Sequence, residues 1–139
     1  MIQRIQSLWL VLAALAAFFT LKFSFFSGNK MDQSSIKTWQ ELTAINNILI
    51  LILTIALGVM AGICIFLYKN RKLQLRLAFV ALAVSLITLA LYYFETKKFT
   101  EGNFNLTALI ALSMPVLLAL ASRGIYKDEK LIKSADRLR

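Results

Sequence analysis

The longest charge-free stretch of the chain runs from residue 42 to residue 68 and reads LTAINNILILILTIALGVMAGICIFLY. Its 27 residues exceed the roughly 20 that a helix needs to cross the hydrocarbon core of a bilayer, because each helical residue advances about 1.5 Å. A helix of a water-soluble bundle needs a polar face, and this stretch carries none. The stretch therefore predicts a transmembrane helix.

Three more charge-free stretches cover residues 5–21, 77–94 and 102–122, and all 23 charged residues lie outside the four stretches. We extend the first past Lys22, because a lysine near a span end lays its stem along lipid and keeps its ammonium at the interface. The predicted spans are about 8–26, 43–68, 75–94 and 104–122, with a tail over 123–139. We expect one domain over 1–139, because the chain is too short for a second.

The composition agrees with membrane spans. Apolar residues make up 59% of the chain and charged residues 17%, against about 45–50% and about 25% in soluble domains. Backbone amides in lipid must be paired internally, and a closed barrel needs many short alternating segments that are absent from this sequence. The predicted fold class is an all-α, four-helix transmembrane bundle. Tryptophan and tyrosine favour the membrane boundary, and all six lie at or just beyond a predicted span end: Trp9, Trp39, Tyr68, Tyr92, Tyr93 and Tyr126.

The basic residues predict the orientation. Eleven would lie on one side of the membrane: Arg4, Lys69, Arg71, Lys72, Arg76, Arg123, Lys127, Lys130, Lys133, Arg137 and Arg139. Five would lie on the other: Lys22, Lys30, Lys37, Lys97 and Lys98. The positive-inside rule places the larger group in the cytoplasm, so both termini are expected there. A cleaved signal peptide is the alternative reading, since Ala14-Leu15-Ala16 has the small-x-small shape of a cleavage site. The apolar run continues past it to Phe26, which favours a retained span.

The tail predicts a short basic amphipathic helix on the cytoplasmic side. Leu131, Ala135 and Leu138 share one helical face, and Glu129 and Lys133 have the favourable i, i+4 order. Together with the loop from Lys69 to Arg76, the helix should attract anionic lipid headgroups at about 1 kcal/mol per basic residue. Anchoring to lipid is favoured over a protein partner here, because ordinary topogenesis already explains basic flanks.

Residues suited to catalysis are scarce. The chain has no histidine and one cysteine, and its four charge-free stretches contain no Asp, Glu or Arg. Lys22 and Ser24 do not face each other on a helix, because residues at i and i+2 point in different directions. We therefore predict no catalytic, cofactor-binding or metal-binding residue, and an enzyme is the least expected class.

Small residues indicate where helices pack. Gly58 and Gly62 form a small-xxx-small motif, and Ala81 with Ser85 repeats the pattern more weakly. Such residues let helix backbones approach in lipid, either within this bundle or against another protein. Pro115 lies in the middle of the fourth span, where it frees the carbonyl of Ala111 and bends the helix.

The two ends of the chain resemble a bacterial family of small four-span proteins, domain-of-unknown-function family 4293. The resemblance rests on Met1–Gln6, on Arg123, on Lys127–Leu131 and on Ser134–Arg139. It implies an integral membrane protein of a Gram-negative lineage, and hence the inner membrane. It implies no activity, cofactor or functional residue.

Three functions are compatible with these features. The favoured one is a non-enzymatic accessory or scaffold subunit of a larger inner-membrane complex, with a membrane-protein partner or a second copy of the chain. The alternative is a small carrier or lipid-handling protein gated near Pro115, whose pocket would be lined by Asn46, Asn47, Thr54, Ser85, Thr88 and Ser113. A further alternative is a ribosome- or translocon-associated factor whose basic face contacts ribosomal RNA; no other nucleic acid is expected.

Overall fold

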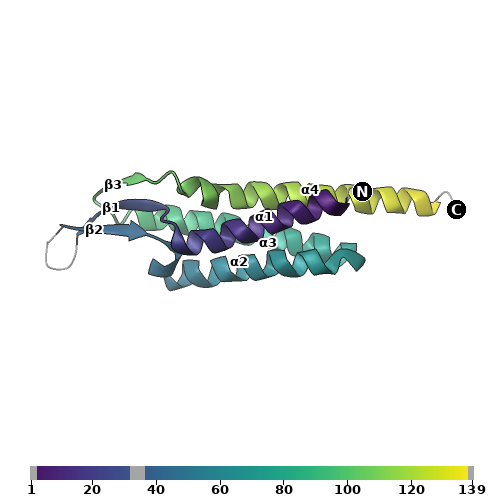
Figure 1. Cartoon of the computed structure of the whole chain (residues 1–139), viewed down its shortest axis with the longest axis horizontal. Helices are drawn as coiled ribbons and strands as arrows, with labels where there is room; N and C mark the ends of the chain where they lie inside the picture. The colour runs from purple at the N-terminus through teal and green to yellow at the C-terminus, as the bar shows by residue number, and fades with distance from the viewer. Residues whose placement is uncertain (1–2, 32–36, 138–139) are drawn as a thin grey trace.

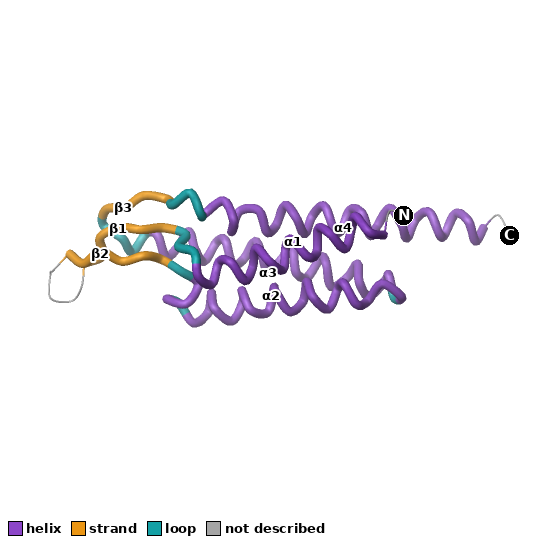
Figure 2. Tube along the Cα trace, in the orientation of Figure 1, coloured by secondary structure: helices purple, strands orange, loops and turns teal. Residues whose placement is uncertain are grey.

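The computed structural model describes residues 3–31 and 37–137 (Figure 1). Four long helices lie along its long axis, and three short strands gather at one end (Figure 2). The helices are α1 (Gln3–Lys22), α2 (Ile48–Phe66), α3 (Arg71–Thr96) and α4 (Ala108–Arg137). The strands are β1 (Phe26–Met31), β2 (Lys37–Leu42) and β3 (Glu101–Phe104), and short 3-10 turns cover Ala44–Asn46 and Leu67–Lys69.

The helices form a ring in which each packs on its two neighbours in sequence, with α1 closing the ring against α4. Consecutive helices run in opposite directions, so the N-terminus and the end of α4 lie at the same end of the bundle (Figure 1). We call that end the basic end, because it carries Lys69, Arg71, Lys72, Arg76, Arg123, Lys127, Lys130 and Lys133. The opposite end, with the strands, is the sheet end. All four helices are long and apolar enough to cross a membrane.

The bundle buries small side chains and exposes large apolar ones. Most buried helix positions hold alanine, glycine or a hydroxyl residue, as at Ala13, Ala61, Ala81 and Ala111. The exposed positions include Leu8, Val11, Leu15, Phe18, Phe19, Ile48, Leu49, Ile52, Val59, Ile63, Phe79, Val80, Leu86, Ile87, Leu109, Leu112 and Val116. In water this arrangement would leave the largest apolar groups unburied, whereas in lipid the helices associate through close contact between small residues.

The three-stranded sheet corrects the all-α expectation. β1 is the central strand and pairs antiparallel with β2 and with β3. Gly28 stands opposite Gly102, and a Cβ on Gly28 would lie 2.2 Å from the carbonyl oxygen of Glu101. Only glycine permits so close an approach. The paired segments lie beyond the helix ends, where the backbone groups find partners across strands.

The helices overlap the predicted spans, but their ends differ. α1 ends at Lys22, so Phe25 and Phe26 leave the helix and Phe26 begins β1. α2 begins at Ile48, because the side chain of Asn47 caps it by accepting a hydrogen bond from the Leu49 amide at 3.0 Å. α3 extends beyond residues 75–94 at both ends, and α4 begins at Ala108 rather than at 104.

The predicted C-terminal helix is present, but it is not a separate element. α4 runs without a break through Pro115 and Arg123 to Arg137. The side chain of Ala135 and the whole of Leu138 lie outside the described part of the chain, so the predicted apolar face is represented there by Leu131, which is exposed. The tail thus continues the fourth helix along the axis of the bundle (Figure 1).

Candidate functional site

A seam of hydroxyl groups runs through the interior of the bundle. The side chains of Thr20, Ser85 and Thr88 are buried, and each donates a hydrogen bond to a carbonyl of its own helix. These bonds satisfy the hydroxyls in an apolar surrounding. The Tyr92 hydroxyl lies near Thr20 and Thr54, yet no hydrogen bond of ordinary geometry reaches the Tyr92 or the Thr54 hydroxyl within the described residues.

Tyr92 lies near the end of α3, and its side chain faces the interior of the bundle. Its side chain is fully buried and its ring stacks on Phe25, with 4.7 Å between the ring centres. Its neighbour Tyr93 is exposed, because successive residues of a helix point about 100° apart. The helical period therefore decides which of the two tyrosines faces outward.

The helix-packing candidates have different surroundings. A Cβ on Gly58 would lie 2.9 Å from the Phe18 ring of α1, whereas a Cβ on Gly62 would meet nothing within 4 Å. Ala81 and Ser85 are fully buried. Close contact within this chain thus involves Gly58, and Gly62 stands beside open space.

Pro115 lies inside α4 and is partly buried. The hydroxyl of Ser113 donates to the carbonyl of Ile110 at 2.7 Å. Proline has no amide hydrogen, so the carbonyl of Ala111 lacks the partner that residue 115 of a helix would normally supply. The Ser113 hydroxyl does not replace that partner, because it bonds to Ile110 instead.

The basic end is held together by contacts between α1, α3 and α4. Gln6 of α1 donates a hydrogen bond from its amide to the carboxylate of Asp128, and both side chains are buried. Gly124 makes room for this contact, since a Cβ there would lie 2.8 Å from the Gln6 side chain. Glu129 pairs with Lys133 at 2.8 Å and also lies near Lys72 of α3.

Past the contact with Gln6, α4 runs on beyond the ends of the other three helices (Figure 1). We call residues 129–137 the α4 extension, and Figure 1 shows it projecting past the N-terminus of α1 along the bundle axis. Leu131 is 57% exposed and Ile132 is 43% exposed. The basic side chains of the basic end are exposed except that of Arg71, which is partly buried. Two more residues belong to the predicted basic face. The side chain of Arg137 and the whole of Arg139 lie outside the part of the chain that the structure describes.

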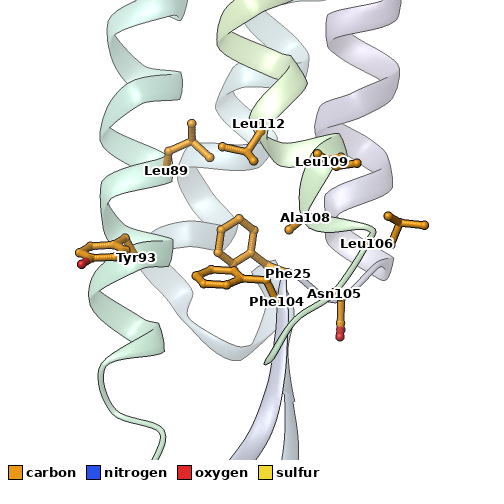
Figure 3. A pocket seen from close by; sticks show the side chains of 9 residues that line it. All are labelled: Phe25, Leu89, Tyr93, Phe104, Asn105, Leu106, Ala108, Leu109 and Leu112. Carbon is orange, nitrogen blue, oxygen red and sulfur yellow. The ribbon is translucent and has the colours of Figure 1, made fainter. Parts of the chain in front are cut away.

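An apolar pocket of about 690 Å³ lies at the sheet end between α3 and α4 (Figure 3). Its lining residues are Phe25, Leu89, Tyr93, Phe104, Asn105, Leu106, Ala108, Leu109 and Leu112. Figure 3 shows the Phe25 and Phe104 rings toward the sheet and Leu89 and Leu112 further along the helices. We call it the sheet-end pocket.

The only amide side chain in that lining is fixed by hydrogen bonds. Asn105 donates to the Ser24 hydroxyl and accepts from the Ser27 hydroxyl at 2.8 Å. Thr107 also donates to the carbonyl of Ser24. These bonds attach the segment between β3 and α4 to the segment between α1 and β1, which sets the floor of the pocket. The sequence has no local signal for this pocket, since three segments that are far apart in the chain build it.

The six residues of the predicted carrier pocket lie in different parts of the fold. Thr54, Ser85 and Thr88 are buried in the packed core. Asn47 caps α2 and donates to Glu95 at 2.7 Å. Asn46 lines another pocket, of about 420 Å³, with Lys30, Gln40, Glu41, Leu42, Glu95 and Phe99.

Together these features define a class: an antiparallel four-helix bundle with a small-residue interior, a three-stranded sheet at one end and a projecting helix at the other. The chain belongs to the family Domain of unknown function (DUF4293), which matches residues 2–138. The match confirms the resemblance seen in the two ends of the sequence. No curated protein and no solved structure matches the chain. Within the described residues, no three His, Cys, Asp or Glu side chains group together as a metal site.

Proposed function

We propose that this protein is a multi-pass protein of a bacterial inner membrane, with both termini in the cytoplasm, and that it serves as a non-enzymatic accessory or scaffold subunit of a larger membrane complex. The distribution of side chains is the reverse of that in a water-soluble bundle, and this supports the membrane location. Leucine, isoleucine and phenylalanine face outward along all four helices, while alanine and hydroxyl residues face inward. Lipid covers the outer residues, and close backbone approach holds the inner ones together.

The charges support the orientation. The basic end has eight described basic side chains, and one of its acidic groups, Asp128, is buried against Gln6. At the sheet end fewer basic side chains are described, and two of them pair with acidic groups: Lys37 lies 3.4 Å from Glu101 and Lys98 lies 2.6 Å from Glu95. The unbalanced positive charge therefore belongs on the cytoplasmic side.

The α4 extension is the observation that carries the accessory role. Leu131 follows Arg123 by eight residues, which is about 12 Å along the helix axis. Because the extension continues along the bundle axis (Figure 1), it leads away from the bilayer, where lipid does not cover Leu131 and Ile132. An exposed apolar face with Lys127, Lys130 and Lys133 beside it fits a partner with an apolar groove bordered by acidic residues.

Co-purification after gentle solubilisation tests the proposal. The double variant Leu131→Gln with Ile132→Gln removes the apolar face, while Lys130→Gln with Lys133→Gln is the matched control that removes charge from the same turns. We expect a defined set of membrane proteins to co-purify with the wild type, and to be lost from the apolar variant more than from the charge variant. A wild-type chain that purifies alone would overturn the proposal.

The same experiment separates the ribosome-associated alternative, which the cluster of basic side chains favours. Contacts with RNA phosphates weaken steeply as salt rises. If the charge variant loses its partners and raising the salt concentration removes them from the wild type, ribosomal RNA contact replaces the accessory role. If the apolar variant loses them at every salt concentration, the accessory role is supported.

A further inference from the structure

The sheet-end pocket is an apolar hollow between two helices. Its volume of about 690 Å³ lies within the range of about 300–1,000 Å³ that is typical of small-molecule sites. The walls are leucine, alanine and aromatic side chains, and the Asn105 amide is occupied by Ser24 and Ser27. The occupant must therefore be apolar where it meets these walls.

The pocket is also open toward the outer apolar surface of the helices. Leu109, Leu112 and Tyr93 line it and are themselves exposed. Leu109 and Leu112 belong to the face of α4 that continues through the exposed Val116. A molecule that lies in the bilayer beside α4 reaches the pocket without crossing water, and the hydrocarbon chain of a lipid has that property.

One positive charge stands beside the pocket. The ammonium of Lys97 lies 5.1 Å from the centre of the Tyr93 ring and 5.6 Å from the centre of the Phe94 ring. Tyr93 is itself a lining residue, so Lys97 is one helical turn beyond the pocket, toward the headgroup region. Among the described residues, Lys97 forms no ion pair, whereas its neighbour Lys98 pairs with Glu95. The ammonium of Lys97 thus remains available to an anion.

We propose that the sheet-end pocket binds one phospholipid of the outer leaflet, with an acyl chain against Leu89, Leu112 and the Phe25 ring, and with its phosphate on the Lys97 ammonium. The apolar walls lie along the helices, where an acyl chain would lie, and the Lys97 ammonium lies beyond them, where the phosphate would lie. A cation held over aromatic rings keeps its position at the interface. The inference rests on the membrane placement proposed above, but not on the partner of the α4 extension.

Native mass spectrometry of the full chain, released from mixed micelles, tests this site. The probes are phosphatidylglycerol and a diacylglycerol with the same acyl chains, which lacks the phosphate. We expect one retained phosphatidylglycerol per chain and about fivefold lower retention of diacylglycerol, the factor that one lysine near a phosphate surface supplies. Equal retention of the two probes would overturn the phosphate contact and with it the proposal.

Two pairs of variants locate the lipid. Leu112→Trp fills the pocket, and Val116→Trp places the same side chain one turn away on the same outer face of α4; the first is expected to lose the lipid and the second to keep it. Lys97→Gln is expected to lower phosphatidylglycerol retention about fivefold, while Lys98→Gln leaves it unchanged. Equal retention within either pair would overturn the assignment.

Folding and partner binding are checked separately. Circular dichroism and gel filtration in detergent verify each variant, and Leu109→Trp is the second pocket-filling variant if Leu112→Trp does not fold. A chain that captures its partners but retains no lipid overturns this inference alone. A chain that retains lipid but purifies without partners overturns the accessory role alone.

Discussion

The side-chain amide of Gln6 donates a hydrogen bond to the carboxylate of Asp128, 122 residues later in the chain, and each residue is only 6% exposed. This contact joins the start of α1 to α4 at the point where the α4 extension begins. Because a buried polar group without a partner is costly, the pair fixes how far α1 and α4 slide along each other. It therefore sets the position from which the extension projects.

Asp128→Ala is expected to lower the free energy of unfolding by about 1–3 kcal/mol, because it leaves the buried Gln6 amide without its acceptor. Denaturant unfolding in detergent, followed by circular dichroism, measures the loss. Glu129→Gln is the control, since its partner Lys133 is exposed and ion pairs at the surface contribute little to stability. Equal effects of the two substitutions would contradict the role of the buried pair.

Gly58→Leu and Gly62→Leu are expected to differ, although the two residues belong to one motif. The first places a side chain where the Phe18 ring already lies, and the second enters open space. We expect Gly58→Leu to destabilise the bundle by about 1–3 kcal/mol and Gly62→Leu to leave its stability nearly unchanged. The same unfolding assay decides; a larger loss at Gly62 would mean that α1 and α2 pack differently.

Pro115→Ala is expected to raise the stability of α4, because it restores the hydrogen bond to the Ala111 carbonyl that proline cannot make. The accessory role predicts that partner capture stays at the wild-type level in this variant. Thermal unfolding and co-purification are the two readouts. Loss of a transport or lipid phenotype with folding intact would instead favour the carrier that is gated near Pro115.

Much of this fold follows from the sequence, because the four helices are set by where charges are absent. The start of α2 after Asn47 and the three-stranded sheet do not follow from that pattern. A side-chain cap decides where α2 begins, and the Gly28–Gly102 approach becomes visible only once two distant segments lie side by side. The positive charges of Lys69 and Arg123, by contrast, do indicate that these two residues lie at the same end of the bundle. The sheet-end pocket has no local signature, since its walls come from α3, α4 and the segments around Phe25 and Phe104.

The direction of α4 is the other feature that sequence reasoning misses. The pattern of Leu131 and its neighbours predicts a helix, and a helix of that composition is usually placed flat on the lipid surface. The unbroken path of α4 through Arg123 gives the extension a different direction, along the bundle axis (Figure 1). In the proposed accessory role, this direction favours a protein contact for Leu131 over the lipid anchoring that the sequence predicts.

Cysteine labelling in intact cells tests the central claim, that lipid surrounds the outer helix faces while the two ends of the bundle face opposite sides of the inner membrane. In a Cys64→Ser background, single cysteines replace Thr100 at the sheet end, Ser134 at the basic end and Val116 on the outer face of α4. With a maleimide that passes the outer but not the inner membrane, we predict that Thr100→Cys is labelled in intact cells, Ser134→Cys only after the inner membrane is opened, and Val116→Cys in neither case. Labelling of Val116→Cys from water, or of Ser134→Cys in intact cells, would contradict the account.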